Sequence, residues 1–206
     1  MQKRILDQVG AESLLSRIDA APTDAEQGFQ PRVVVNPPDH IMERVYRIRT
    51  LAWQQQATLT AASDRWTETW DACSYHYVLM IEDEPVGAFR FSLHASPAEL
   101  PNSEIYGSLL DHLPAPVAWF SRLVIHPDFQ GKGYSRQLDS LALSEPLSAG
   151  AASVVATGGS VIGNLTRHAV MLRRGWTDAG VTLGAPKGEH IADHNPRVFY
   201  KIYDAG

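Results

Sequence analysis

The chain has 206 residues, of which 44% are hydrophobic and 20% charged, and its formal net charge is -5. This composition is typical of a globular protein. No tail of the chain is dominated by charges of one sign, so we expect no nucleic-acid partner. No stretch approaches the ~20 apolar residues that cross a bilayer, and the first residues lack the apolar core of a secretory signal. The single cysteine, Cys73, cannot form an internal disulfide. We therefore expect a cytoplasmic protein with no membrane span.

The first 31 residues differ from the rest of the chain. Apolar residues recur at helical spacing over residues 3–20, and residues 21–31 have the polar, proline-containing composition of a linker. We divide the chain into an N-terminal helix and linker, residues 1–31, and one domain, residues 32–206.

From residue 32 onward, strand-like and helix-like segments alternate. The turn at Asp83-Glu84-Pro85 separates two apolar runs, which is typical of a hairpin. Residues 95–115 form a long connection with a short helical turn inside it. The order of elements predicts a mixed α/β (α+β) fold around one sheet. The expected strands are residues 32–35, 75–82, 86–94, 117–125, 153–157 and 197–203, and the expected helices are residues 39–56, 134–143 and 164–174.

The most informative segment connects the strand at residues 117–125 to the helix that begins at Tyr134. The connecting loop reads Gln130-Gly131-Lys132-Gly133-Tyr134-Ser135. The first turn of a helix has unpaired N–H groups and a positive dipole end, and glycines let the backbone approach a bulky anion. Such a loop can bind a phosphate or pyrophosphate through its N–H groups. A strand–helix turn that binds no ligand can have the same sequence pattern. It matches neither the P-loop pattern nor the dinucleotide-binding pattern.

In its context, this loop resembles motif A of the GNAT superfamily of acyl-CoA N-acyltransferases. In that motif, Q/R-x-x-G-x-G/A follows a strand and holds the coenzyme A pyrophosphate. Gln130, Gly133 and Ser135 fall on the three motif positions, with serine where glycine or alanine is usual. The strand end Leu123–Pro127 is similar to the segment before the motif. Three further segments resemble family signatures: Pro85-Val86-Gly87, Asn164 with Ala169, and Gly175-Trp176.

The resemblance implies a mostly antiparallel sheet flanked by helices, and acetyl-CoA or another acyl-CoA as co-substrate. Backbone N–H groups of the loop would bind the pyrophosphate, through Gln130, Gly131, Lys132, Gly133, Tyr134 and Ser135. The strand end would bind the pantetheine and the thioester carbonyl through Leu123, Val124 and Ile125. Asn164 would orient the pantetheine or its helix.

The implied reaction is direct attack of a primary amine on the thioester, which needs a base for the amine. His126, at the end of the strand, and Glu82, in the hairpin turn, are the candidates. The family's usual acid is a tyrosine four residues before the closing glycine, and this chain has Met171 there. A tyrosine elsewhere can replace it, or the thiolate leaves unassisted, or the site is not catalytic. The candidate tyrosines are Tyr134, Tyr200 and Tyr203.

A second resemblance competes with the first. Ser121-Arg122 before Leu123-Val124 is similar to the S-R-F-x-V strand of acyl-homoserine-lactone synthases and N-acyl amino acid synthases, and Trp66, Asp71 and His76 fit their pattern. These enzymes take acyl chains from acyl-carrier protein. A buried Arg122 needs an acidic partner, and we consider Asp71 or Glu82.

We therefore expect an N-acyltransferase that acts on a small-molecule or peptide amine. The alternatives are a long-chain synthase that uses acyl-carrier protein and a non-catalytic acyl-CoA sensor. A homodimer fits the family. No metal is expected, because His190 and His194 stand between proline-containing loop segments.

Overall fold

The computed structural model describes residues 30–55, 63–158, 165–182 and 197–204. The expected N-terminal helix, Asn164 and the histidines at 190 and 194 lie outside these residues. None of the described helices is long and apolar enough to cross a membrane.

Within the described residues, a sheet of seven strands forms the centre of the fold, in the order β1-β2-β3-β4-β5-β7-β6. Neighbouring strands are antiparallel except β4 and β5, which are parallel. The expected mixed, mostly antiparallel fold is thereby confirmed. The strands are β1 (Arg32–Val35), β2 (Tyr75–Ile81), β3 (Glu84–His94), β4 (Val117–Ile125), β5 (Ser153–Gly158), β6 (Thr177–Thr182) and β7 (Arg197–Ile202).

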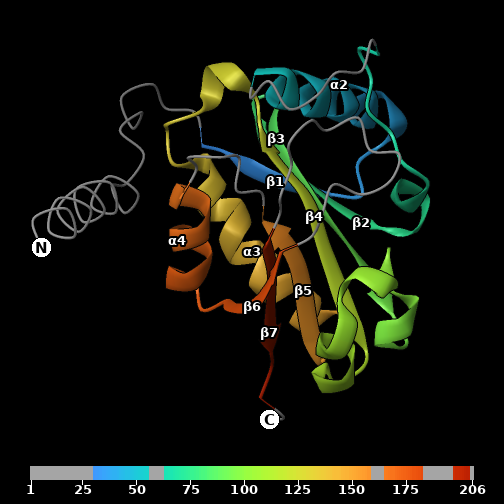
Figure 1. Cartoon of the computed structure of the whole chain (residues 1–206). Helices are drawn as coiled ribbons and strands as arrows, with labels where there is room; N and C mark the ends of the chain where they lie inside the picture. Colours follow the sequence, from blue (N-terminus) through green and yellow to red (C-terminus); the bar gives the residue numbers. More distant parts are fainter. Residues whose placement is uncertain (1–29, 56–62, 159–164, 183–196, 205–206) are drawn as a thin grey trace, which may run out of the picture.

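Helices cover both faces of this sheet. In Figure 1, α2 lies on one face, and α3 and α4 lie on the other. The α-helices are α2 (Asp39–Gln55), α3 (Tyr134–Ser148) and α4 (Leu165–Arg173). Short 3-10 helices connect the strands: η2 (Thr69–Cys73), η3 (Pro97–Glu99), η4 (Ser103–Ile105), η5 (Gly107–His112) and η6 (Pro127–Phe129).

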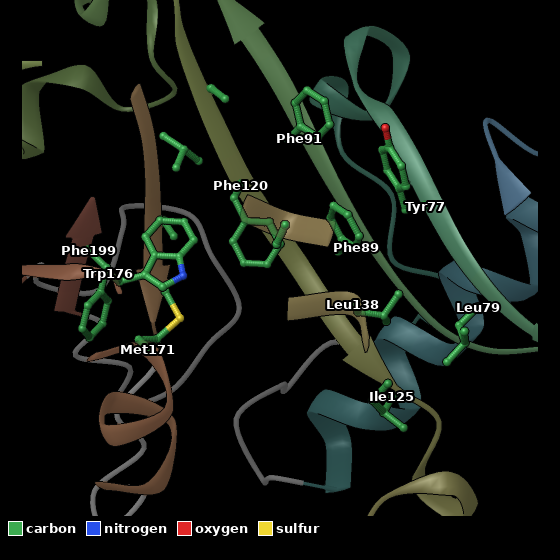
Figure 2. Packing of buried hydrophobic residues seen from close by; sticks show 14 of the residues in the cluster. Tyr77, Leu79, Phe89, Phe91, Phe120, Ile125, Leu138, Met171, Trp176 and Phe199 are labelled. Atoms are coloured by element: carbon green, nitrogen blue, oxygen red, sulfur yellow. The ribbon is translucent and has the colours of Figure 1, made fainter. Parts of the chain in front are cut away.

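Alternating side chains of β2 show how the two faces divide. Tyr77 and Leu79 belong to the core that α3 and α4 cover, whereas Val78 and Met80 pack against α2. Successive residues of a strand point to opposite faces, so the apolar run of β2 serves two cores at once. Figure 2 shows the core on the α3 side, where Leu138 of α3 lies near Ile125 and Leu79.

Most expected elements are present with bounds shifted by at most one or two residues, and two elements differ more. Helix α3 continues past residue 143, through Pro146, to Ser148. Strand β6 was not expected because its sequence, TDAGVT, has little apolar alternation. It lies at the end of the sheet order and pairs with β7 alone, so tertiary pairing rather than local pattern defines it.

Candidate functional site

Strand β4 contains a β-bulge. Ala88 pairs with Val124 and Arg90 pairs with Ser121, so Arg122 and Leu123 together face the single residue between Ala88 and Arg90. Arg122 has a φ of 56°, in the left-handed region. A bulge adds one residue and redirects the side chains after it. Here Ser121 and Arg122 both reach the α2 side of the sheet, where they contact Arg90 and Glu68 respectively.

Beyond the bulge, β4 and β5 cease to pair. Their parallel ladder covers Val117–Phe120 and Ser153–Ala156 only, while β5 continues to Gly158 in pairing with β7. Among the described residues, no strand pairs with the β5-facing edge of β4 after Phe120. The backbone groups along this edge are therefore placed to bind an extended molecule as an added strand would bind.

The edge leads into the glycine-containing loop. His126 N–H donates to the carbonyl of Val86 at 2.8 Å, and the Gln130 side-chain amide donates to the carbonyl of Ile125 at 3.3 Å. These bonds hold the chain as it leaves β4. Gly131 and Gly133 have φ values of 76° and 81°. A Cβ at Gly131 would have nothing within 4 Å, so the space beside the loop is open.

The loop ends at the first turn of α3, which begins at Tyr134. Helix N-termini leave N–H groups without intrahelical partners and carry a partial positive charge. Lys132 belongs to this loop, and its ammonium lies 5.3 Å from the Phe129 ring centroid. The arrangement can accept an anion at the end of the open edge.

Apart from Asn164, which lies outside the described residues, the expected binding residues form one continuous segment, whereas the catalytic candidates are scattered. Residues 123–135 run continuously from the bulge to the first turn of α3. His126 is half-buried, and its Nδ1 accepts from the Asp128 N–H at 3.3 Å. Glu82 is exposed in the β2–β3 turn. Tyr134 is 8% exposed, with its ring in the α3-side core.

The other tyrosines and Met171 are also engaged in packing. Met171 is 1% exposed in the core, and Figure 2 shows it beside Trp176. Tyr203 donates its hydroxyl to the carbonyl of Leu143 at 2.7 Å, and burial raises its pKa. Tyr200 is half-buried and packs against the cluster that contains Trp119.

A charged cluster lies on the α2 face of the sheet beside the bulge. Asp71 accepts from Arg49 at 2.8 Å and from Arg90 at 2.5 Å. Glu68 binds Arg90 and accepts from Arg122 Nε at 2.8 Å. Arg49 and Arg90 are both 0% exposed. The cluster therefore joins α2, η2 and its preceding residue, β3 and β4 through buried ion pairs.

This cluster corrects the partner expected for Arg122. The carboxylate that binds it is Glu68, whereas Asp71 binds Arg49 and Arg90, and Glu82 is exposed at the hairpin turn. Glu68 lies in an irregular segment with no periodic pattern, so the sequence carried no signal for it. The segment reaches the cluster only because the chain folds back over the sheet.

The arginines set the charge states of the acids. Burial by itself raises the pKa of Glu68, but hydrogen bonding and charge from Arg122, with the charge of Arg90, outweigh it and lower that pKa. Asp71 behaves in the same way, since Arg49 and Arg90 overcome the effect of burial on its pKa. Both carboxyls are therefore ionised at neutral pH.

Ion pairs and a histidine–carboxylate hydrogen bond also connect α4 to its neighbours. Arg167 of α4 binds the buried Asp139 of α3 at 2.8 Å, and His168 binds Asp178 of β6 at 2.8 Å. Arg197 of β7 binds the same Asp178 carboxylate at 2.8 Å. These contacts connect α4 to α3 and, through Asp178, to β6 and β7.

The comparisons with known proteins agree with this architecture. The sequence model of the Acetyltransferase (GNAT) family matches residues 42–176, and the chain belongs to this family. No curated protein sequence matches the chain.

Several solved structures share the fold. An N-acyl amino acid synthase from uncultured soil microbes superposes with a TM-score of 0.63 at 10% identity, over 84% of this chain and 92% of that one. An Arabidopsis thaliana protein in complex with the bisubstrate analogue CoA-Ac-MVNAL gives a TM-score of 0.58 at 12% identity, over 83% and 99% of the two chains. A putative N-acetyltransferase from Lactobacillus plantarum gives 0.55 at 17% identity, over 84% and 97%.

Among the described residues, no group of three or more histidine, cysteine, aspartate or glutamate side chains is placed to hold a metal ion.

Proposed function

We propose that this protein is an N-acyltransferase that moves an acyl group, with acetyl as the expected one, from acyl-CoA to a primary amine. The observation that carries the proposal is the edge of β4 after Phe120, which no strand of the described residues pairs with and which leads through the glycine-containing loop to the first turn of α3. An extended pantetheine can pair with that edge, and its pyrophosphate then reaches the N–H groups of residues 130–135.

The reaction follows from where the thioester would lie. Its carbonyl oxygen would accept from backbone N–H groups near Leu123 and Ile125, which stabilise the negative charge of the tetrahedral intermediate. The amine nitrogen forms the C–N bond, the C–S bond breaks, and coenzyme A leaves as a thiolate. One proton of the attacking nitrogen passes to a base or to water.

The acid and base roles receive different support. His126 stands at the end of the β4 edge, and its Nδ1 accepts from the Asp128 N–H. In the neutral ring this tautomer has its hydrogen on Nε2, so His126 acts as a base only when the contact with Asp128 is released and a nitrogen lone pair is exposed. The ring of Tyr134 packs in the core, so the proposal uses its backbone N–H at the helix start. Met171 stands at the position of the family's usual tyrosine and is buried in the core. The proposal therefore has coenzyme A leave as a thiolate without protonation by a tyrosine at that position.

A second candidate is a synthase that takes a long acyl chain from acyl-carrier protein. The observation that favours it is the Ser121-Arg122 pair at the bulge, with Arg122 bound to Glu68. The similarity in fold to the soil N-acyl amino acid synthase is compatible with it. The third candidate is a sensor that binds acyl-CoA without turnover.

Mass spectrometry of the purified protein, followed by a thiol-release assay with acyl-CoAs of increasing chain length, separates these functions. Retained coenzyme A and release with acetyl-CoA plus an amine support the main proposal. Release only with long chains on acyl-carrier protein supports the synthase, and binding without release on any amine supports the sensor. A protein that binds no form of coenzyme A and transfers no acyl group would refute the assignment.

A further inference from the structure

Arg122 has a backbone conformation that an arginine disfavours. Its φ of 56° lies in the left-handed region, which costs an L-residue about 1–2 kcal/mol. In one common type of β-bulge, the residue with this conformation is glycine. Because arginine has no such freedom, contacts elsewhere must hold the Arg122 backbone in this conformation.

Two side chains hold the guanidinium of Arg122. Its Nε donates to one carboxylate oxygen of Glu68 at 2.8 Å, and its Nη2 binds the other oxygen of the same carboxylate. The guanidinium carbon lies over the Trp66 ring, 4.4 Å from the ring centroid. A two-point ion pair fixes the plane of a guanidinium, and the aromatic contact adds to it. The Arg122 side chain is 11% exposed, so water competes little for these contacts.

The segment that supplies these contacts is attached to α2 and to the sheet. The Trp66 N–H donates to the carbonyl of Tyr46 in α2 at 3.2 Å, and the Trp66 ring packs edge-to-face against Trp53 of the same helix. Glu68 also binds the buried Arg90 of β3. The positions of Glu68 and Trp66 are therefore set by α2 and β3.

The backbone of Arg122 determines the direction of the next N–H group. The peptide unit between residues 122 and 123 is planar, so the backbone dihedral angles of Arg122 decide where the Leu123 N–H points. This N–H belongs to the part of β4 after Phe120, whose β5-facing edge pairs with no strand of the described residues. It is one of the groups to which the proposed function assigns the thioester carbonyl.

The direction of this N–H matters for the reaction more than for coenzyme A binding. A donor stabilises the tetrahedral intermediate only at about 2.7–3.1 Å from the oxyanion, and removing one such donor lowers kcat by about 10²–10³. The pyrophosphate is assigned to N–H groups of residues 130–135, in the loop and the first turn of α3. A change confined to the bulge should therefore affect kcat and leave the affinity for free coenzyme A unchanged.

We propose that Arg122 is a positioning residue for acyl transfer, and that Glu68 and Trp66 hold its side chain so that the bulge presents the Leu123 N–H to the thioester oxygen. The proposal rests on the proposed function and adds residues that act through the backbone. In this role none of the three side chains takes up or releases a proton. The role is the same for acyl-CoA and for acyl-carrier protein, because both donors present a thioester.

Arg122→Gly tests this role, because glycine allows a positive φ and removes the side chain that Glu68 and Trp66 hold. In a thiol-release assay with acetyl-CoA and a panel of primary amines, we expect kcat to fall at least tenfold. The KM for acetyl-CoA and the affinity for free coenzyme A, measured by calorimetric titration, should change less than twofold. Arg122→Lys keeps the charge without the two-point contact, and its kcat should fall between the two proteins.

Arg49→Met is the matched control. Arg49 is 0% exposed and belongs to the same charged cluster, where it binds Asp71 at 2.8 Å rather than Glu68. Its loss should lower the unfolding midpoint, as the loss of Arg122 should, yet leave kcat unchanged at temperatures where the protein is folded. If kcat falls equally in Arg49→Met and Arg122→Gly, the cluster contributes stability alone and the positioning role is refuted.

A spectroscopic measurement reports the hydrogen bond without any amine. Acetyl-CoA labelled with 13C at the acetyl carbonyl should show a downfield shift of that resonance when it binds to the wild-type protein. The shift should be smaller on Arg122→Gly and unchanged on Arg49→Met. A full shift on a folded Arg122→Gly protein overturns the proposal.

The remaining outcomes separate this inference from the function on which it rests. If Arg122→Gly does not fold, Trp66→Leu keeps the ion pairs and should lower kcat about two- to fivefold, and an unchanged kcat then overturns the proposal. Thiol release by the wild type with an unchanged kcat in Arg122→Gly refutes the positioning role and leaves the acyltransferase function standing. The carbonyl shift without thiol release for any amine refutes the function and supports the role of Arg122 at the bound thioester.

Discussion

Replacing Glu68 by glutamine tests whether the charged cluster holds the fold together at the bulge. Glu68→Gln removes the carboxylate that binds both Arg90 and Arg122, of which Arg90 is 0% exposed. Removing one partner of a buried ion pair costs about 3–5 kcal/mol, because it leaves an uncompensated charge in a poorly solvated place. Since Arg90 keeps Asp71, we expect the lower value, about 3 kcal/mol in the free energy of unfolding.

The expected loss is large enough to measure by thermal unfolding. For a domain of this size, each kcal/mol moves the midpoint by about 2–4 °C, so Glu68→Gln should lower it by about 6–12 °C. Glu43→Gln is the matched control, because Glu43 binds Arg65 in a pair whose side chains are 44% and 48% exposed. Such a pair contributes about 0–1 kcal/mol.

Circular dichroism of the three proteins, with heat and with urea, gives the comparison. If Glu68→Gln unfolds at the same midpoint as Glu43→Gln, the ion pairs at the bulge do not stabilise this protein and the reasoning is refuted. If Glu68→Gln lowers the thermal midpoint, it should also lower the urea concentration at which half of the protein is unfolded. The dependence of the free energy of unfolding on urea concentration should stay unchanged.

Three further predictions concern the loop, α4 and acid. Gly131→Ala places a side chain at a φ of 76°, a conformation that costs an L-residue about 1–2 kcal/mol. Calorimetric titration should therefore show that coenzyme A binds about fivefold or more weakly to this variant. An unchanged affinity would argue against the loop as the binding site. Arg167→Met leaves the buried Asp139 without its partner and should lower the free energy of unfolding by about 3 kcal/mol, whereas the exposed Arg173→Met should change it little. The pKa values of Glu68 and Asp71 are below their ordinary values of 4.5 and 3.8, so the stability they contribute is present above those values and is lost as pH falls through the lower folded-state values. Urea midpoints measured from pH 5 downward should therefore fall less steeply in Glu68→Gln than in the wild type, and parallel curves would contradict this.

Much of the architecture could be predicted from local pattern. The apolar run at residues 117–125 and the turn residues around Asp83 define β4 and the β2–β3 hairpin, and the structure has β4 at the expected bounds. The spacing of glycines after β4 indicated the loop before α3, and two glycines there do adopt positive φ. These features depend on neighbouring residues, which is why periodicity and turn chemistry reveal them.

The side-chain cluster beside the bulge was only partly predictable. The sequence indicated that a buried Arg122 needs an acid, but Glu68 is separated from it by 54 positions and lies in a segment without periodicity. Strand β6 was missed for a related reason, since its pairing with β7 and not its own residues makes it a strand. His76 was visible in the sequence, yet its buried place beside Asp71 could be found only from the tertiary structure.

The sequence by itself determined the order of most strands and helices and the strand–loop–helix segment that can hold a diphosphate, because hydrophobic periodicity and glycine placement act over a few residues. The tertiary structure alone decided the bulge in β4, its separation from β5, the choice of Glu68 as the partner of Arg122 and the buried place of His76. Each of these depends on strand register and on burial shared between distant segments, and neither quantity is encoded in any short stretch of the chain.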